Sequence, residues 1–375
     1  MNEYRLQHID GIEQLRVAAT RWDDLWGRSE VTLPMARAEF LAQWVETFSQ
    51  PAGFHALVAE DLQGSFVAAL PMVDTRMAGT VRTATALSNH WSCGGDLLLD
   101  DSAEKDAALD VLLSGVADLP RDLLWLDGMA IDAPRWKKFA SAADRAGLST
   151  DFTEHYQVAT IEIGDNWEAC RQTWSKNHRK KMARYIRRLE ERGELRLSLH
   201  RDLTPERLEP KLREAFELED RGWKGAAGTS VLQTAGMFEF FHQQARLLAK
   251  QGELQLSFLE LDSRPIAYSY AMAAGGVHHS LKISFDREFA AYSPGQVLRY
   301  FLLERFHADP TCRAMDCNGP LNVSQVPWKP TTYRTGRVAV APRRLIGRTI
   351  LHAYKHWWPQ LSQLRSPSGL KVGAG

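Results

Sequence analysis

The sequence predicts a mixed α/β fold in which one α/β unit occurs twice. The 375 residues are 44% hydrophobic and 25% charged, an ordinary globular composition that allows two domains of ~100–200 residues each. A β-hairpin pattern occurs in each half of the chain and is followed both times by the same order of elements. The two halves also differ in net charge, which suggests separate units.

Each hairpin pattern has two runs of strand-forming residues around a turn. The first, residues 54–73, turns at Gly64, and the second, residues 254–273, turns at Asp262–Pro265. The first is followed by a strand, a loop of small residues, a helix and a strand, at 81–87, 92–95, 103–118 and 123–127. The second is followed by the same kinds of element, at 278–285, 293–295, 296–308 and 315–319.

The segment between the two copies, residues 166–192, predicts one helix. Its apolar residues recur mostly at steps of three and four: Trp167, Cys170, Trp174, Met182, Tyr185 and Leu189. Gly193 is expected to end this helix. Two further helices are predicted at 205–221 and 235–251.

These elements set the expected domain boundaries. We expect an N-terminal domain at 1–155 and a C-terminal domain at 156–345, followed by a helix at 346–365. A docked helix is preferred here over a basic, Trp-containing helix that touches a membrane. The Ser/Gly-rich tail at 366–375 is expected to be disordered.

The charge of the chain is balanced overall and unbalanced along its length. The 46 basic and 46 acidic residues cancel, so the whole molecule is not a general polyanion binder. The first 150 residues hold 13 of the basic and 22 of the acidic residues, which leaves 33 and 24 for the remainder. An anionic ligand is therefore expected on the second half.

The cysteines and the N-terminal segment suggest a cytoplasmic protein. Cys93, Cys170, Cys312 and Cys317 form no CxxC pair and no zinc-ligand spacing, so neither a disulfide framework nor a metal site is expected. The polar N-terminus does not resemble a signal peptide, and no apolar run approaches the ~20 residues of a membrane span. P-loop, GxSxG and HExxH motifs are absent from the sequence, which leaves Walker-type phosphoryl transfer, serine hydrolysis and zinc peptidase chemistry unsupported.

The loop before the helix at 296–308 is a candidate phosphate or pyrophosphate cradle. A glycine at 295 lets the backbone approach a ligand closely, and the free N–H groups and dipole of the first helical turn favour an anion. The candidate donor-binding residues are Tyr292, Ser293, Gly295, Gln296 and Arg299. A Pro/Gly loop that merely starts a helix is the alternative.

A basic segment precedes this cradle in the chain. Nine Lys or Arg residues lie between Arg171 and Arg192, against Glu190 and Glu191, a net charge of +7. RNA phosphates, the 3′-phosphate of CoA, an anionic polysaccharide and a membrane surface are all compatible with such a segment, and so is a solvated helix face. The candidate anion-binding residues are Lys176, Arg179 and Lys180.

Candidate acid–base and substrate-side groups lie at strand ends and in the loops that follow. We favour Asp286 as the base, with Lys329 and Tyr333 on the substrate side and Asp316 as a substrate-binding group. An aspartate at a strand end more often caps a turn.

The loop at 221–230 is a candidate lid over an acceptor. Trp223 and Lys224 lie in it among several glycines, and a long flexible connection is the alternative interpretation. In the first copy, the loop at 92–96 ends in Asp96, an acidic residue where an anion would have to sit. No phosphate is expected there.

Three blocks of the sequence resemble a known family. They are Asp-x-x-Phe-x-x-Tyr-Ser-Pro-Gly at 286–295, the basic block at 175–190, and Asp-x-Asn-Gly at 316–319 with Trp-Lys at 328–329. Together with the Trp-Lys-Gly segment at 223–225, they resemble the acetyltransferase domain of CelD/BcsL-type and BioF2-like proteins. That family belongs to the GNAT superfamily and is related to the FemAB aminoacyl ligases.

This resemblance implies an α+β (mixed α/β) fold of two tandem GNAT-like domains in a FemAB-like arrangement. It implies acyl-CoA, with acetyl-CoA foremost, as a co-substrate held at the strand–loop–helix junction, and no permanently bound cofactor. The acyl group would pass directly to an amine or hydroxyl of a small molecule, such as a sugar or a cell-envelope or exopolysaccharide precursor.

Two alternatives stay open beside the acyl-CoA enzyme. The usual acyl-CoA signature of the superfamily, Gln/Arg-x-x-Gly-x-Gly/Ala, is replaced here by Ser-Pro-Gly-Gln at 293–296. A FemAB-like enzyme would use aminoacyl-tRNA instead. A non-catalytic GNAT-fold module would bind RNA or another anionic polymer through residues 171–192.

Overall fold

The computed structural model describes residues 3–365, and the chain divides into two compact units. The first unit contains the residues up to Glu30, Trp44–His155 and the residues from Thr335 onward. The second unit contains Val31–Gln43 and Tyr156–Arg334. Each unit has its own hydrophobic core and its own run of paired strands.

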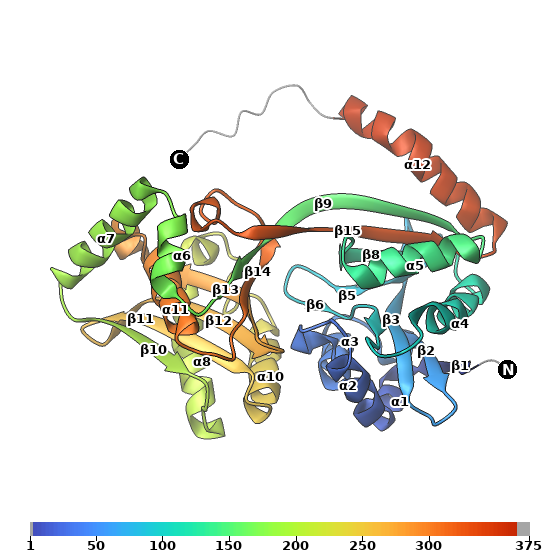
Figure 1. The fold of residues 1–375 in the computed structure, drawn as a ribbon, viewed down its shortest axis with the longest axis horizontal. Coiled ribbons are helices and arrows are strands. Elements are labelled where there is room, and N and C mark those ends of the chain that lie inside the picture. Colours follow the sequence, from blue (N-terminus) through green and yellow to red (C-terminus); the bar gives the residue numbers. More distant parts are fainter. Residues whose placement is uncertain (1–2, 366–375) are drawn as a thin grey trace. The chain divides into compact units, whose positions relative to one another are not determined.

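The strands of the first unit are paired in the order β1-β2-β3-β4-β8-β15 (Figure 1). All neighbours are antiparallel except β4 and β8, which are parallel. The strands are β1 (Tyr4–Asp10), β2 (Phe54–Asp61), β3 (Phe66–Met77), β4 (Val81–Thr85), β8 (Leu123–Ala130) and β15 (Thr331–Ala341). The helices are α1 (Gly11–Val17), α2 (Ala19–Gly27), α4 (Lys105–Asp118), α5 (Pro134–Arg145) and α12 (Leu345–Arg365). Short strands β5 (Leu87–Ser88), β6 (Cys93–Gly94) and β7 (Leu98–Leu99) lie in the loop before α4.

The strands of the second unit are paired in the order β9-β14-β13-β12-β11-β10. Again all neighbours are antiparallel except one pair, β13 and β14. The strands are β9 (Ser149–Glu162), β10 (Leu195–His200), β11 (Leu254–Leu261), β12 (Arg264–Ala274), β13 (Val277–Phe285) and β14 (Ala314–Pro320). The helices are α6 (Trp167–Thr173), α7 (Lys176–Glu190), α8 (Pro205–Asp220), α9 (Trp223–Ala226), α10 (Met237–Lys250) and α11 (Pro294–His307). The helix α3 (Ala38–Phe48) has residues in both units, and so do β9 and β15.

Corresponding elements occur in the same chain order in both units, which confirms the predicted two-copy mixed α/β fold. The first copy runs β1, α1–α2, β2, β3, β4, α4 and β8; the second runs β10, α8–α10, β11, β12, β13, α11 and β14. The final strands are exchanged, since β9, which follows the first copy, pairs with β14, and β15, which follows the second, pairs with β8. Each sheet is thus completed by a strand that follows the other copy in the chain.

Burial explains why the central strands of the second unit are so apolar. Helix α11 packs on one face of its sheet through Val297, Leu302 and Phe306, while α8 and α10 pack Phe216 and Phe241 against tyrosines of β12 on the other. Residues 266–272 of β12 are buried without interruption, which is expected of a strand covered on both faces.

The prediction of one helix over 166–192 is wrong, because the segment forms two helices, α6 and α7, that break at Trp174. Ser175 begins α7 as its N-cap, where its side chain accepts the N–H of His178 at 3.1 Å. The Arg179 guanidinium donates to the carbonyl oxygens of Gln172 at 3.0 Å and Trp174 at 3.1 Å, which satisfies the end of α6. The apolar periodicity continues across this break and conceals it.

The last helix, α12, is docked on the first unit. Leu351 is fully buried against Leu123 and Ala339. Arg337 lies 4.2 Å from the ring centroid of Trp125 and donates to the Tyr354 hydroxyl at 2.8 Å. Residues 366–375, expected to be a disordered tail, lie outside the described residues.

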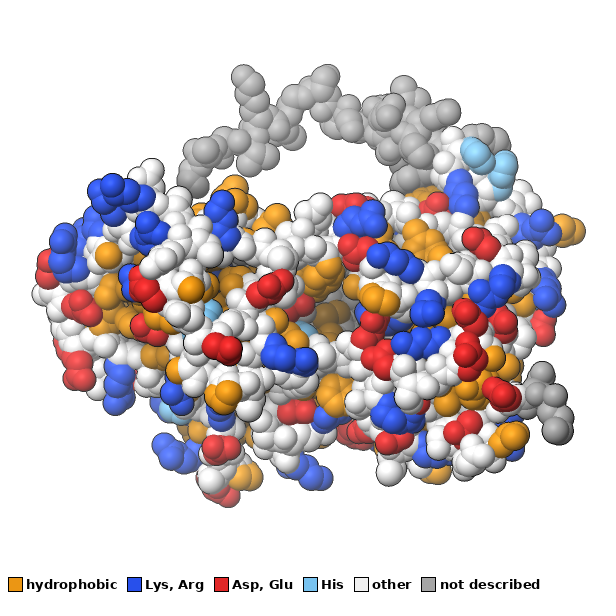
Figure 2. Space-filling view, in the orientation of Figure 1, with side chains coloured by type: hydrophobic (Ala, Val, Ile, Leu, Met, Phe, Trp, Pro, Cys, Tyr) orange, Lys and Arg blue, Asp and Glu red, His pale blue; other side chains and the backbone are white. Residues whose placement is uncertain are grey.

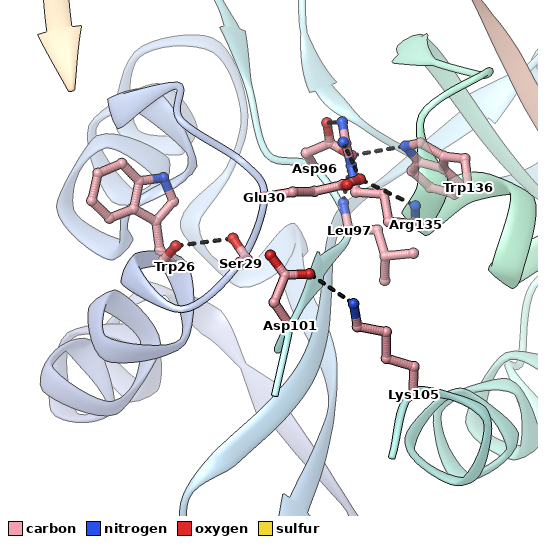
Figure 3. Close-up of polar contacts among 9 residues, drawn as sticks. All are labelled: Trp26, Ser29, Glu30, Asp96, Leu97, Asp101, Lys105, Arg135 and Trp136. Atoms are coloured by element: carbon pink, nitrogen blue, oxygen red, sulfur yellow. Dashed lines mark hydrogen bonds and ion pairs between the residues drawn. The ribbon is translucent and has the colours of Figure 1, made fainter. Parts of the chain in front are cut away.

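A buried arginine organises the polar interior of the first unit (Figure 3). Arg135 of α5 bonds Glu30 at 2.8 Å and Asp96 at 2.5 Å, and Trp136 donates its indole N–H to Asp96 at 2.9 Å. Burial by itself would lower the pKa of Arg135, but the two carboxylates outweigh it and raise that pKa. Asp96, the acidic residue of the first copy's loop, therefore serves to anchor α5.

The docking of α12 depends on a glycine. A Cβ at Gly347 would lie 1.8 Å from the carbonyl oxygen of Asp122, a contact that only backbone movement can relieve. We expect Gly347→Ala to lower stability by roughly 1–3 kcal/mol, the usual cost of overpacking, as measured by thermal or urea unfolding. Gly27→Ala is the matched control, because a Cβ at Gly27 has no neighbour within 4 Å. Equal stability of the two variants would contradict the tight contact.

Candidate functional site

An opening between two parallel strands is the centre of the candidate site. β13 and β14 are paired only at Val277↔Ala314, His278↔Met315 and His279↔Asp316, and both strands continue beyond this point without pairing to each other. We call this divergence the β13–β14 opening. The other edge of β13 is also irregular there, because its register with β12 shifts between Tyr270 and Ala271. Bulges of this kind are common next to active sites.

Helix α11 begins at the end of β13 that borders this opening. A short 3₁₀ helix, η3 (Arg287–Tyr292), leads from β13 to Ser293, which adopts a left-handed conformation with φ 48°. α11 then starts with Pro294, and the Ser293 carbonyl oxygen accepts the N–H of Gln296 at 2.9 Å. A Cβ at Gly295 would meet Phe285 at 3.6 Å, an ordinary contact, so packing within the protein does not require this glycine. The predicted order of strand, loop and helix is therefore present.

The basic helix α7 lies beside the start of α11, so two features predicted separately are brought together. Arg192, just beyond α7, donates to the Tyr292 hydroxyl at 2.9 Å, and the Arg188 guanidinium lies 4.8 Å from the centroid of the same ring. The Tyr185 pKa is raised by burial, but Ser293 and Lys181 outweigh this and lower it. Figure 2 shows Lys and Arg side chains gathered over α7.

Buried polar atoms without partners cluster around the opening. They are His279 Nδ1 and Ser280 Oγ on β13, Asn318 Nδ2 on β14, and Nε and Nη1 of Arg299 on α11. Arg299 is 6% exposed, and in the described part of the chain these two nitrogens have no hydrogen-bond partner. Buried polar groups are nearly always satisfied in folded proteins. A ligand with hydrogen-bond acceptors would satisfy the Arg299 nitrogens and Asn318 Nδ2, so the residues present fit such a ligand.

The Trp328–Lys329 pair lies against α11. The Trp328 indole N–H donates to Gln296 Oε1 at 2.7 Å, and the Arg299 guanidinium lies 6.0 Å from the Trp328 ring centroid. Lys329 ends the short helix η4 (Val326–Trp328) in a left-handed conformation, with its side chain exposed. The structure therefore brings these four predicted residues together.

Asp316 and Tyr333 form a second predicted pair, at the point where β14 leaves β13. Asp316 accepts the Tyr333 hydroxyl at 3.0 Å and the backbone N–H of Asn318 at 2.7 Å. Burial raises the pKa of Asp316, and these two hydrogen bonds offset that effect only in part. Beside it, burial lowers the pKa of His279 to about 4, so this ring is neutral at physiological pH.

Asp286 lies at the end of β13 with both carboxylate oxygens engaged. One oxygen accepts the Arg264 guanidinium at 2.8 Å, and the other accepts the N–H of Glu288 at 3.0 Å, which caps η3. Arg221 approaches the same carboxylate at 3.7 Å. This geometry matches an aspartate that caps a turn, and the role of Asp286 as a base stays a prediction.

The remaining predicted residues lie outside the opening. Lys176 and Lys180 are exposed on α7, whereas Arg179 is used to cap α6. Lys224 lies on the short helix α9 and pairs with the fully buried Glu219 at 2.5 Å. Trp223 begins α9, and its side chain lies outside the described residues.

Sequence reasoning missed Lys282. It lies on β13 beyond the last residue paired with β14, and its ammonium nitrogen is 3.7 Å from Glu219. Burial lowers the pKa of Lys282 to about 8. The available signal was a lysine in a predicted strand, residues 278–285, that contains no other Lys, Arg, Asp or Glu.

The second unit also holds two surface cavities. One, of about 470 Å³, is lined by Trp328, Lys329 and residues of α6; the other, of about 610 Å³, lies between α8 and α10. Among residues 3–365, no cluster of His, Cys, Asp and Glu could hold a metal ion. No helix in the same range is long and apolar enough to span a membrane.

We expect Arg299→Met to leave the stability of the ligand-free protein unchanged within about 1 kcal/mol, or to increase it. The substitution removes a buried charge that has no carboxylate partner and keeps most of the side-chain volume. Arg135→Met is the matched control, because its buried guanidinium holds two carboxylates, and we expect it to lose about 3–5 kcal/mol. Urea unfolding of both variants checks this. A loss at Arg299 as large as that at Arg135 would refute the assignment of Arg299 as unpartnered.

Solved structures similar to this chain support the two-copy fold. The structure of FemX has 12% identity and a TM-score of 0.60, and the match covers 88% of this chain and 98% of that one. A conserved protein of unknown function from Bacteroides thetaiotaomicron has 12% identity and a TM-score of 0.54, with 86% and 97% covered. At these identities the likeness concerns the fold. None of the curated proteins matches the chain.

The family match falls on the unit that contains the opening. Residues 176–329 match the family model described as an acetyltransferase (GNAT) domain. This range holds α7, β13, η3, α11 and β14, the elements around the β13–β14 opening. The mixed α/β fold thus consists of two tandem GNAT-like units, and the match of the second unit to a GNAT acetyltransferase domain supports acyl transfer as the class of reaction.

Proposed function

We propose that the second unit transfers an acyl group from an acyl-CoA thioester to an amine or hydroxyl. The observation that carries this proposal is the set of unpartnered buried groups around the β13–β14 opening, inside the range that matches the GNAT domain. The donor would lie along this opening, with its phosphate groups at the start of α11. Arg188 and Arg192, which flank Tyr292 there, supply positive charge for those phosphates.

The chemistry requires no covalent enzyme intermediate. The acceptor nitrogen or oxygen attacks the thioester carbonyl carbon, a new C–N or C–O bond forms, and the C–S bond breaks. The acceptor gives up one proton, and the CoA thiolate takes up one as it leaves. In this proposal Lys329 and Tyr333 hold the acceptor, and Arg299 and Ser293–Gln296 hold the donor. No permanently bound cofactor is needed.

The finer assignment follows the resemblance to CelD/BcsL-type and BioF2-like proteins. We infer an acetyl group as the acyl group and a sugar or cell-envelope precursor as the acceptor, handled in the cytoplasm. Lys224, next to Trp223, would help to hold that acceptor from α9, since its ammonium is fixed by Glu219.

Titration calorimetry with acetyl-CoA, longer acyl-CoAs and free CoA tests the donor assignment. We expect micromolar binding that Gly295→Glu weakens at least about tenfold, because the new carboxylate occupies the anion position at the start of α11. Gly27→Glu, at an exposed position with no neighbour within 4 Å, is the control and should bind like the natural chain. Binding that survives in Gly295→Glu would exclude this cradle. No binding of any CoA compound would exclude acyl-CoA as the donor.

A second candidate function is supported by the exposed cations of α7. Five cations of α7 are exposed: Lys180, Lys181, Arg184, Arg187 and Arg188. The C-terminal part of α7 lies beside Tyr292, just before α11, because the Arg188 guanidinium contacts that ring. A FemAB-like enzyme would use such a face for aminoacyl-tRNA, and a non-catalytic module would use it for another polyanion. An exposed row of cations binds phosphates in a salt-dependent way.

The double variant Lys180→Gln and Lys181→Gln tests this second candidate. If α7 contacts RNA phosphates, binding of unfractionated tRNA in a filter or anisotropy assay should weaken, and the dependence of log K on log salt should become shallower by about one for each phosphate-binding lysine removed. Lys137→Gln with Lys138→Gln is the control, because it removes an equally exposed lysine pair from α5 of the first unit. If both doubles weaken binding equally, or neither weakens it, α7 is not the surface that binds RNA.

A further inference from the structure

Lys282 occupies an unusual place on β13. It lies on the part of the strand that is not paired with β14, next to the irregularity in the β12–β13 register, where Tyr270 is its partner. Its side chain reaches Glu219 of α8, on the face of the sheet covered by α8 and α10. The side chain is only 10% exposed. A lysine in such a position is rare, because burial of an ammonium is costly.

A single carboxylate is shared between two ammonium groups here. Glu219 is fully buried, and one of its oxygens is 2.5 Å from Lys224 and 3.7 Å from Lys282. Its other oxygen accepts the backbone N–H of Val231 at 3.0 Å. Lys224 therefore holds the closer contact with this carboxylate, and Lys282 holds the longer one.

An aromatic ring and a buried phenol also lie close to this group of charges. Its ammonium lies 4.7 Å from the ring centroid of Phe241 on α10, and the fully buried Tyr268 lies beside Glu219 on β12. Burial is the main cause that lowers the pKa of Lys282 to about 8, with Lys224 acting in the same direction and Glu219 opposing it. A useful fraction of this amine is thus neutral near physiological pH.

Glu219 and Tyr268, which lie beside Lys282, do not titrate in the same range. Burial raises the pKa of Glu219, but Lys282 and Lys224 outweigh this and lower it, so the carboxylate stays ionised. Burial raises the pKa of Tyr268 well above its ordinary value, so that phenol stays neutral. Of Glu219, Tyr268 and Lys282, it is therefore Lys282 whose charge changes near neutral pH.

We propose that Lys282 is the proton acceptor of the acyl transfer at the β13–β14 opening. This inference rests on the proposed acyl-CoA function and gives the base role to Lys282 in place of Asp286, whose two carboxylate oxygens are engaged by Arg264 and the N–H of Glu288. The neutral Nζ takes the proton from the attacking acceptor as its nitrogen or oxygen bonds to the thioester carbon. The C–S bond breaks, the thiolate is protonated from solvent, and the Lys282 ammonium then returns its proton to solvent.

Release of CoA thiol from acetyl-CoA, with glucosamine or water as the acceptor, is the readout. We expect kcat/KM to rise with pH and to level off above about pH 9, because the neutral form of Lys282 increases through its pKa of about 8. We expect Lys282→Arg to lose about 10²–10⁴-fold in kcat/KM, because a guanidinium keeps the charge but does not accept a proton. Calorimetric binding of acetyl-CoA and the melting temperature should stay near those of the natural chain. Lys282→Met repeats the test with the charge removed, in case the larger guanidinium does not fit.

Lys224→Met separates a base from a structural ion pair. Lys224 lowers the pKa of Lys282, and Glu219 raises it. Removal of the Lys224 ammonium should therefore raise the Lys282 pKa and move the rising limb of the pH profile to higher pH. The ionisation of glucosamine itself cannot produce this shift, because it is the same for both enzymes. Titration of Lys282 as its ¹³C-dimethyl derivative in the intact protein, assigned with Lys282→Arg, gives the same pKa without activity. Lys138→Arg, on an exposed face of α5, is the control for labelling.

The outcomes distinguish this inference from the proposed function. If acetyl-CoA is turned over and Lys282→Arg retains activity within threefold, Lys282 is structural and the acyltransferase proposal stands without it. An ordinary lysine pKa in the NMR titration, or a pH profile that Lys224→Met leaves in place, also overturns the base role. If no CoA thiol is released with either acceptor, the proposed function fails and the role of Lys282 fails with it.

Discussion

The loss of pairing between β13 and β14 is the constraint on which the candidate site depends. Hydrogen bonds between these parallel strands stop at His279 and Asp316, although both strands continue. An unpaired strand edge inside a domain needs another partner for its polar groups. Around this edge the unit gathers a helix start, a basic helix and several polar side chains whose own partners are missing. The candidate site lies where the sheet is incomplete.

Arg299 illustrates how such a site differs from ordinary interior packing. In the first unit, the buried Arg135 is matched by Glu30 and Asp96 and holds a helix in place (Figure 3). In the second unit, Arg299 is equally buried and has two unpaired nitrogens. A buried arginine therefore contributes to stability in the first unit. In the second unit, a buried arginine has unsatisfied hydrogen-bond donors to which a ligand could bind. Duplicated units can diverge in this way without any change of fold.

Local patterns were sufficient to predict most of the fold. Hairpin turns at Gly64 and Asp262, followed by the same series of elements, indicated the two copies because each pattern depends on neighbouring residues. The break between α6 and α7 was missed, since the capping role of Ser175 competes with an apolar periodicity that runs through it. The start of α11 and the Trp328–Lys329 pair were predicted as parts of a site. Their hydrogen bond through Gln296 depends on the tertiary structure. Lys282 was missed because its lowered pKa depends on burial and on Glu219 and Lys224, which are distant in the sequence.

The exchange of final strands has a consequence for how the protein is made. The sheet of the first unit needs β15, which ends at Ala341, and that of the second needs β9, which begins at Ser149. During synthesis from the N-terminus, the β8 edge of the first copy therefore stays unpaired until β15 has emerged. If the chain were cut between the two copies, the N-terminal half would keep β9, which pairs with β14 of the second copy. The C-terminal half would keep β15, which pairs with β8 of the first copy. A truncation between the copies would therefore leave both sheets without their final strand.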